Sequence, residues 1–218
     1  MKRQKSFKKT IELVKTGLSA LEFVPGESFF QSLQSYLEQL ERFSKAYNIT
    51  GFRDCHSLAE RGIIDSLLYL EFIPEGSRTL LDVGSGAGLP GLIIKMARPE
   101  LEVTLIEPSR KKAAFLDFVS NKLNLKNTHL FQTSVEQHAS TKQQYDVITT
   151  RALFKADEML RKVSPFLKTN SRVILSKGPK AIEEVSGLKD HRDLKIELHR
   201  RKLPFSGIER YFLVIEKQ

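Results

Sequence analysis

Apolar side chains recur at intervals of three and four residues along the first third of the chain. The pattern is longest between Ser28 and Tyr47, where one face collects Phe29, Phe30, Leu33, Tyr36, Leu37, Leu40 and Phe43. It is also present from Ile11 to Leu21 and in a segment beginning at Ser57, which we expect to cap a helix together with Glu60. The sequence therefore predicts three amphipathic helices before residue 75.

Beyond residue 75 the pattern changes to short apolar runs, rich in β-branched residues, that alternate with helical segments. The runs are Leu80–Val83, Glu102–Glu107, Thr128–Gln132, Tyr145–Thr150, Arg172–Ser176, Leu194–Leu198 and Tyr211–Ile215, and the helical segments start near Leu89, Arg110 and Met159, the last reaching Leu167. This alternation predicts a doubly wound, mostly parallel α/β sheet of the Rossmann-like type, and the last two runs should pair antiparallel. We expect a helical extension over residues 1–75 and the sheet domain over residues 76–218.

Composition limits the partners and the compartment. The 218 residues include 35 basic and 26 acidic side chains and carry a formal net charge of +9, so the surface should attract polyanions such as nucleic acid. The single cysteine, Cys55, excludes an intrachain disulfide and fits a reducing cytoplasm. No apolar run approaches the roughly 20 residues of a membrane helix, and the basic N-terminus lacks the apolar core of a signal peptide. We therefore expect a cytoplasmic monomer without membrane contact.

Glycines cluster directly after the first strand, between Asp82 and Gly91. Gly86, Gly88 and Gly91 alone match G-x-G-x-x-G, a fingerprint of dinucleotide-binding oxidoreductases, but that match leaves Asp82 and Gly84 inside the strand. The spacing Asp82-x-Gly84-x-Gly86-x-Gly88 instead resembles the first motif of class I S-adenosylmethionine-dependent methyltransferases. This interpretation makes Asp82, Gly86 and Gly88 candidate cofactor-binding residues and S-adenosylmethionine the cofactor.

Charged residues end or follow the next strands, at the sheet edge where the glycine loop lies. Glu107 ends the second strand, where a carboxylate could accept hydrogen bonds from both ribose hydroxyls of the cofactor. Val135 and Glu136 follow the third strand, and Arg151 ends the fourth. Each has a plainer alternative: the two glutamates could be exposed surface residues, and Arg151 could form a structural ion pair. The five histidines show no zinc-binding spacing, so we expect no metal site.

Several segments together resemble one family of enzymes. They are Asn48–Thr50, Arg61–Leu67, Asp82–Gly91, Val135–Glu136, Thr150–Ala152 and Lys177–Gly178. The family is the bacterial RsmG family, also called glucose-inhibited division protein B, of 16S rRNA guanine-N7 methyltransferases, and the resemblance covers most of the chain. It implies methyl transfer from S-adenosylmethionine to guanine N7 in 16S rRNA or a precursor of the small ribosomal subunit. Carried over position by position, it implies cofactor contacts at Gly84, Leu89, Val135, Glu136 and Arg151.

The chain departs from the family pattern at three positions. Gly62 stands where the family usually has a histidine, and Glu107-Pro108 replaces an Asp-Ser pair. Leu153 replaces an aromatic residue expected two positions after Arg151, with Phe154 displaced by one position as a candidate for base stacking.

Guanine N7 carries no proton at neutral pH, so its methylation requires no general base and we assign no catalytic side chain. Because A-form RNA hides N7 in a deep, narrow groove, the target nucleotide should lie in a loop or be splayed out. The candidates for gripping the RNA backbone are basic: Lys2, Arg3, Lys5, Lys8, Lys9, Arg110, Lys111, Lys112, Arg200, Arg201 and Lys202. The plainer interpretation of these residues is a solvated N-terminal tail and solvated helix and strand faces.

Other functions stay open from sequence alone. A class I methyltransferase could act on another RNA, a protein or a small molecule. A noncatalytic RNA-binding module would explain the positive charge but not the glycine loop or Glu107. A dinucleotide oxidoreductase would explain the loop only without Asp82 and Gly84.

Overall fold

The computed structural model describes residues 4–151, 153–188 and 193–218. The N-terminal part is helical, with α1 (Gln4–Ala20), α2 (Glu27–Ser44) and a continuous helical segment over residues 55–72. That segment comprises α3 (Cys55–Ser57), the π-helical turns η1 (Leu58–Ile64), α4 (Asp65–Leu67) and the 3-10 turn η2 (Leu68–Phe72). Because α1 begins at Gln4, Lys8 and Lys9 belong to a helix, and the expected solvated tail is wrong for these two residues.

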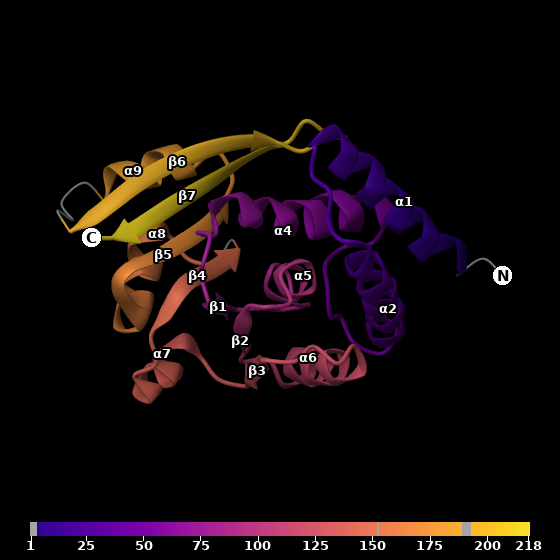
Figure 1. Cartoon of the computed structure of the whole chain (residues 1–218), viewed down its shortest axis with the longest axis horizontal. Helices are drawn as coiled ribbons and strands as arrows, with labels where there is room; N and C mark the ends of the chain where they lie inside the picture. Colours follow the sequence, from indigo (N-terminus) through magenta and orange to yellow (C-terminus); the bar gives the residue numbers. More distant parts are fainter. Residues whose placement is uncertain (1–3, 152, 189–192) are drawn as a thin grey trace.

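Seven strands form one sheet in the order β3-β2-β1-β4-β5-β7-β6 (Figure 1). Their bounds are β1 (Thr79–Val83), β2 (Glu102–Ile106), β3 (Thr128–Phe131), β4 (Tyr145–Arg151), β5 (Leu167–Lys177), β6 (Leu194–Lys202) and β7 (Glu209–Lys217). The strands β1 to β5 pair in parallel, whereas β7 is antiparallel to both β5 and β6. The predicted doubly wound sheet with an antiparallel C-terminal strand is confirmed.

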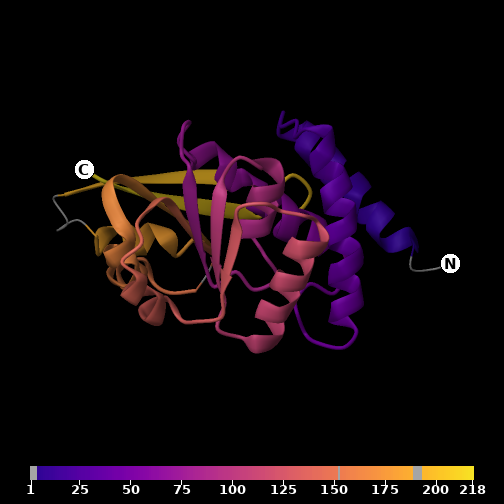
Figure 2. The same cartoon turned by 60° about the horizontal axis from the view of Figure 1, so that its bottom comes forward.

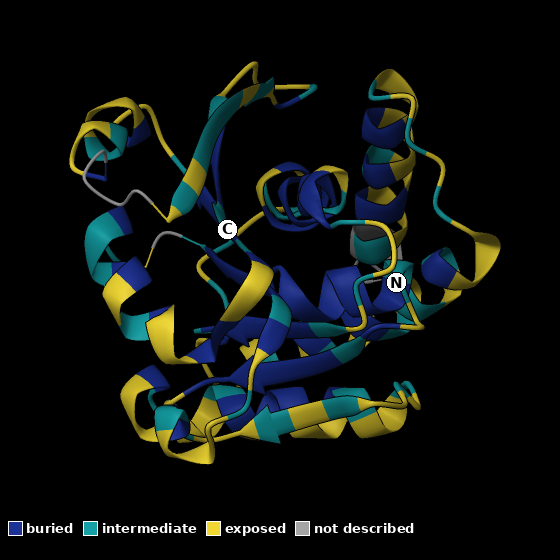
Figure 3. Ribbon diagram, turned by 60° about the vertical axis from the view of Figure 1, so that its left-hand side comes forward, coloured by how far each residue is buried: buried dark blue, intermediate teal, exposed yellow. Residues whose placement is uncertain are grey.

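Helices cover both faces of the sheet because the strands alternate their apolar side chains between two cores. One core joins Leu80 and Val147 to α1, α2, the 55–72 segment, α5 (Gly91–Ala97) and α6 (Arg110–Lys122). The other joins Leu81 and Ile148 to α7 (Val135–His138), α8 (Ala156–Val163) and the turn η4 (Ser164–Phe166). The turn η3 (Ala139–Thr141) and α9 (Ala181–Ser186) complete the described helices. In Figure 3 the central strands are coloured as buried, and the helices carry exposed positions on their outer sides.

The helices α1 and α2 lie on the side of the molecule opposite the C-terminus (Figure 2), whereas the end of the 55–72 segment packs beside β4 and β5 through Tyr69 and Phe72. The side chains of the helical extension share the first core with strand residues, so it has no separate hydrophobic core among the described residues. The division into residues 1–75 and 76–218 stays a prediction. No helix in the described part of the chain has the length and apolar character needed to cross a membrane.

Two local expectations are wrong. Ser57 does not cap the third helix: Asp54 does, accepting a hydrogen bond from Ser57 N at 2.8 Å. Glu60 is instead buried and accepts hydrogen bonds from the backbone N–H groups of Phe205 and Ser206, both at 2.7 Å. Leu167 was expected in a helix but begins β5, because α8 ends at Val163 and Pro165 lies in the following turn.

Candidate active site

The glycine loop leaves β1 at the carboxyl edge of the sheet, between β1 and β4, where the strand order reverses. Such a switch point is where open α/β sheets bind ligands. Gly84, Gly86 and Gly88 adopt φ values of 71°, 60° and 87°, which side chains strongly disfavour. The hydroxyl of Tyr36, from α2, donates a hydrogen bond to the carbonyl oxygen of Ala87 at 2.8 Å. The helical extension therefore holds the loop from outside the sheet.

Asp82 braces the loop from inside the sheet. Its side chain is fully buried, and its two oxygens accept hydrogen bonds from Thr149 Oγ1 at 2.9 Å and from Gly91 N at 3.1 Å. Burial raises the pKa of Asp82 to about 6. Because its side chain has no exposed surface and both oxygens bond within the protein, Asp82 fixes the start of α5.

Glu107 joins the loop to the end of β2. One carboxylate oxygen accepts a hydrogen bond from Gly86 N at 2.8 Å, and the other accepts one from Ser109 N at 2.9 Å. Each oxygen keeps a further lone pair, so the carboxylate can still accept two hydrogen bonds from a ligand. The structure thus brings the predicted acid and the predicted loop into direct contact.

Val135 and Glu136 begin α7, on the connection after β3. Val135 is buried in the second core, while the exposed carboxylate of Glu136 forms an ion pair with Lys162 from α8. This partner lowers the pKa of Glu136. The Glu136 side chain is therefore directed to α8, and any cofactor contact in this segment falls to its backbone.

Arg151, at the end of β4, faces the 55–72 segment. Its Nη1 donates a hydrogen bond to the carbonyl oxygen of Arg61 at 3.0 Å, and its guanidinium lies 5.8 Å from the centre of the Phe52 ring. Ala152 lies outside the described residues. Leu153 covers the start of the glycine loop, because its Cδ1 lies 2.2 Å from the position that a Cβ on Gly84 would take.

At Gly62, where the family pattern has a histidine, neighbouring side chains occupy the space that a larger residue would need. A Cβ at this position would lie 3.1 Å from Leu58 Cδ1 and 3.3 Å from Phe52 Cε2. The Phe52 ring thus stands beside the helix where the family's larger side chain would project.

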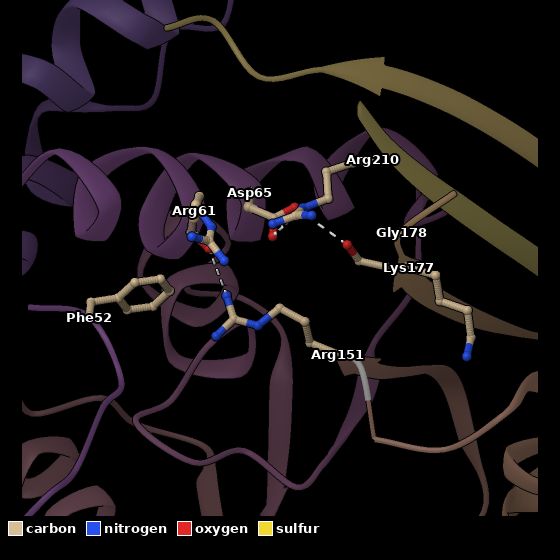
Figure 4. A pocket seen from close by; sticks show the side chains of 8 residues that line it. Phe52, Arg61, Asp65, Arg151, Lys177, Gly178 and Arg210 are labelled. Atoms are coloured by element: carbon tan, nitrogen blue, oxygen red, sulfur yellow. Dashed lines mark hydrogen bonds and ion pairs between the residues drawn. The ribbon is translucent and has the colours of Figure 1, made fainter. Parts of the chain in front are cut away.

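A pocket of about 290 Å³ opens beside Arg151 at the same edge of the sheet (Figure 4). Its lining residues come from the 55–72 segment, the preceding loop and the ends of β4, β5 and β7, and they are Phe52, Arg61, Asp65, Arg151, Ser176, Lys177, Gly178 and Arg210. Of these, only Arg151 was a candidate site residue from sequence; Arg61, Asp65, Lys177 and Gly178 lie in segments that carry the family resemblance, and Phe52, Ser176 and Arg210 were not singled out. The periodicity of apolar residues predicts the helices and strands but does not indicate that these lining residues meet in one pocket.

Asp65 is the one carboxylate that lines this pocket. Only 1% of its side chain surface is exposed, and it accepts a hydrogen bond from Arg210 Nε at 3.1 Å and a long one from Ser176 Oγ at 3.4 Å. Burial raises its pKa, and the nearby charges of Arg210 and Arg151 oppose that shift. The Asp65–Arg210 pair therefore ties the helical extension to the last strand.

Part of the set of basic residues proposed to face RNA lies at the same edge, while Lys8 and Lys9 are exposed on α1. Arg110 and Lys111 are exposed at the start of α6, beside the Glu107 connection, and Lys112 is half-buried. Arg200 lies opposite Tyr211, which itself pairs with Lys177 at the end of β5. Arg200 and Arg201 form ion pairs with Glu209 and Glu71, so their charges are partly compensated. Lys2 and Arg3 lie outside the described residues, and so does the side chain of Lys5.

Comparison with known proteins identifies the family. The family model GidB, described as rRNA small subunit methyltransferase G, matches residues 30–206. The chain belongs to the GidB family. A Mesoplasma florum protein named ribosomal RNA small subunit methyltransferase G is 34% identical over 202 residues, which are 91% of this chain and 85% of the relative. An Acinetobacter baumannii protein of the same name is 35% identical over 188 residues, 85% of this chain and 87% of the relative.

Solved structures share the fold of this GidB-family protein. An O-methyltransferase from Bacillus cereus, in complex with S-adenosylhomocysteine, has a TM-score of 0.63 at 13% identity and covers 94% of this chain and 100% of its own. A methyltransferase from Geobacter sulfurreducens has a TM-score of 0.59 at 15% identity and covers 93% and 95%. The predicted family, fold class, enzyme class and cofactor are confirmed: the protein is a methyltransferase that uses S-adenosylmethionine.

Proposed function

We propose that this GidB-family protein transfers a methyl group from S-adenosylmethionine to N7 of a guanosine in 16S ribosomal RNA. The observation that carries the proposal is the contact between Glu107 and Gly86 beside a cationic pocket at one sheet edge. The names of the relatives support ribosomal RNA of the small subunit as the substrate. Such a substrate is consistent with a cytoplasmic protein.

The residues around the loop fit this cofactor. A Cβ on Gly86 would meet only Gly84 O, at 3.8 Å, so the backbone is open to a close approach there. The spare lone pairs of Glu107 suit two ribose hydroxyls. We assign cofactor contacts to Gly84, Gly86, Gly88, Leu89 and Glu107, to Val135 and Glu136 through their backbone, and to Arg151, and we assign Asp82 the positioning of the loop.

For this reaction the residues of the site have to orient the methyl group of the cofactor toward guanine N7. S-adenosylmethionine supplies an electrophilic methyl group on a positively charged sulfur. Guanine N7 offers a lone pair and no proton, so no side chain has to accept one. Holding the reacting groups in line can contribute roughly 7 to 11 kcal/mol to the lowering of the barrier. Tyr36, Asp82 and Glu107 meet this demand because each fixes the glycine loop through a hydrogen bond.

Basic residues at the same edge would hold the surrounding RNA. Arg110, Lys111 and Lys112 begin α6 after the Glu107 connection, Arg200 and Arg201 lie on β6, and we assign the exposed Lys8 and Lys9 of α1 to the same RNA surface. Binding through phosphates should weaken steeply as salt concentration rises. An RNA affinity that does not change with salt concentration would show that these residues do not contact the RNA phosphates.

The test is methylation of RNA from cells that lack this protein. The purified protein is incubated with tritiated S-adenosylmethionine and either 16S rRNA or isolated small subunits, and the labelled nucleoside is identified after digestion. We expect N7-methylguanosine in 16S rRNA. Label in another nucleoside, in ribosomal protein or in a small molecule would contradict the proposed substrate. RNA binding without any transfer of label would favour a noncatalytic module.

A further inference from the structure

Three arginine side chains line the pocket beside the glycine loop: Arg61 from η1, Arg151 from β4 and Arg210 from β7. Figure 4 shows their guanidinium groups turned toward the same space. Lys177 also lines the pocket, but its ammonium donates to Phe154 O at 2.6 Å and pairs with Glu184 at 2.8 Å. The charge that faces the cavity is therefore carried by the three arginines and by Asp65.

This charge is only partly compensated within the chain. Asp65 pairs with Arg210. Neither Arg61 nor Arg151 forms an ion pair with a carboxylate among the residues that the structure describes, and Arg151 contacts the carbonyl oxygen of Arg61 and the ring of Phe52. Arg61 is exposed, so water screens part of its charge, and Asp65 is the carboxylate that faces three guanidinium groups in this pocket. The pocket therefore keeps an excess of positive charge that can bind an external anion.

The backbone of η1 contributes to this arrangement. Isolated π-helical turns inside a helix are frequent at functional sites, and this one carries Arg61 in its middle. The carbonyl oxygen of Arg61 receives the hydrogen bond from Arg151, which places the two residues in direct contact. Asp65, one turn further on, orients Arg210 through Nε and leaves its Nη groups available. A planar guanidinium group can donate two parallel hydrogen bonds to two oxygens of one phosphate.

We propose that this pocket binds a backbone phosphate of the substrate RNA next to the guanosine that is methylated. The inference rests on the proposed function and adds a phosphate site to it. Arg61 and Arg210 come from segments outside the glycine loop, so they can hold the RNA while the loop holds the cofactor. Arg61 and Arg210 contact the phosphate, Arg151 lies between this site and the cofactor that it contacts, and Asp65 is a positioning residue for Arg210.

The test replaces Arg61, whose guanidinium forms no hydrogen bond or ion pair with another described residue and whose loss should leave the melting temperature unchanged. Arg61→Gln is compared with Arg78→Gln, which removes the same charge from an exposed arginine just before β1, at the opposite edge of the sheet. Arg61→Lys keeps the charge without the planar fork. For each variant we measure the Kd for a 16S rRNA transcript across a range of salt concentrations, and the Kd for S-adenosylhomocysteine by calorimetry.

We expect Arg61→Gln to weaken RNA binding about tenfold and to reduce the slope of log K against log salt by about 0.7 to 0.9, with cofactor affinity unchanged. Arg78→Gln should retain the wild-type slope, and Arg61→Lys should restore it with part of the affinity. Weaker S-adenosylhomocysteine binding with unchanged RNA binding would assign the pocket to the cofactor carboxylate and overturn the inference. Equal behaviour of Arg61→Gln and Arg78→Gln would also overturn it. Failure of the wild-type protein to bind RNA would instead contradict the proposed function itself.

Discussion

The carboxylate of Glu107 accepts a hydrogen bond from the backbone N–H of Gly86, 2.8 Å away. This bond joins the end of β2 to the loop that follows β1. The other carboxylate oxygen of Glu107 accepts a hydrogen bond from Ser109 N at 2.9 Å. One side chain therefore sets the distance between two segments that we assign to the cofactor.

Replacing this carboxylate should weaken cofactor binding. In Glu107→Gln a single acceptor oxygen faces two backbone N–H groups, so one of them loses its partner, and the charged acceptor for the ribose is lost as well. We expect the Kd for S-adenosylhomocysteine to rise at least tenfold in calorimetry, since hydrogen bonds to charged groups contribute about 1.5 to 3 kcal/mol. Glu100→Gln, at an exposed glutamate paired with Arg98, is the control and should bind like the wild type. Equal affinities for the two variants would refute the role of Glu107.

Asp82 should make the stability of the protein depend on pH. Its pKa is raised from 3.8 to about 6, so between these values the folded state keeps a proton that the unfolded state releases. The stabilisation is complete below pH 3.8 and is lost as the pH rises through about 6. The difference in unfolding free energy between wild type and Asp82→Asn should fall by about 2 kcal/mol from pH 4 to pH 7.

Urea unfolding of both proteins at each pH measures this difference, and the contributions of other groups cancel. The asparagine can keep both contacts, with its oxygen toward Gly91 N and its amide toward the Thr149 hydroxyl. A difference that stays constant from pH 4 to pH 7 would mean that Asp82 is not a buried acid with a raised pKa.

Gly91 leaves no room for a side chain. A Cβ there would lie 2.6 Å from Asp82 Oδ2 and 2.6 Å from Leu105 Cδ2, so Gly91→Ala must displace the residue that braces the loop. We expect a loss of about 1 to 3 kcal/mol in thermal or urea unfolding, as for other overpacked sites. Gly51→Ala is the matched control because nothing lies within 4 Å of its Cβ position. Similar stability of the two variants would show that the loop is less tightly held than described here.

Tyr36 should connect the helical extension to cofactor binding. In Tyr36→Phe the ring can still pack against Phe115, but the buried carbonyl of Ala87 loses its donor. We expect a stability loss of about 1 to 3 kcal/mol and a higher Kd for S-adenosylhomocysteine. Tyr47→Phe, at an exposed tyrosine whose ring lies near Lys111, should change neither quantity. An unchanged Kd in Tyr36→Phe would show that this contact of the helical extension does not affect cofactor binding.

The sequence predicted the parts of this molecule that depend on local pattern. Apolar runs such as Leu80–Val83 and Tyr145–Thr150 are strands, and the glycine spacing after Asp82 led to a loop at the carboxyl edge of the sheet. The acid at the end of β2 was predicted because it follows the glycine loop at the distance typical of a βαβ unit. All of these features depend on residues close together in the sequence: apolar side chains for the strands, and glycines that can take positive φ for the loop.

Pairings between distant segments could not be predicted in the same way. Glu60 has the spacing of a capping residue, yet it bonds to backbone N–H groups near residue 205, which no local pattern reports. Asp65 and Arg210 lie 145 residues apart and meet only because β7 is added antiparallel beside β5. Asp82 was expected to contact the cofactor, but Thr149 and Gly91 take up its oxygens once the strands are aligned. The cationic pocket depends on these tertiary pairings.

A crystal structure of the protein with S-adenosylhomocysteine tests the central claim most directly. The claim is that the glycine loop and Glu107 together hold the cofactor at the switch point between β1 and β4. We predict electron density for the ligand along residues 84–89, with its ribose hydroxyls within hydrogen-bonding distance of the Glu107 carboxylate. Density for the ligand elsewhere on the molecule, or none at a saturating concentration, would contradict the account.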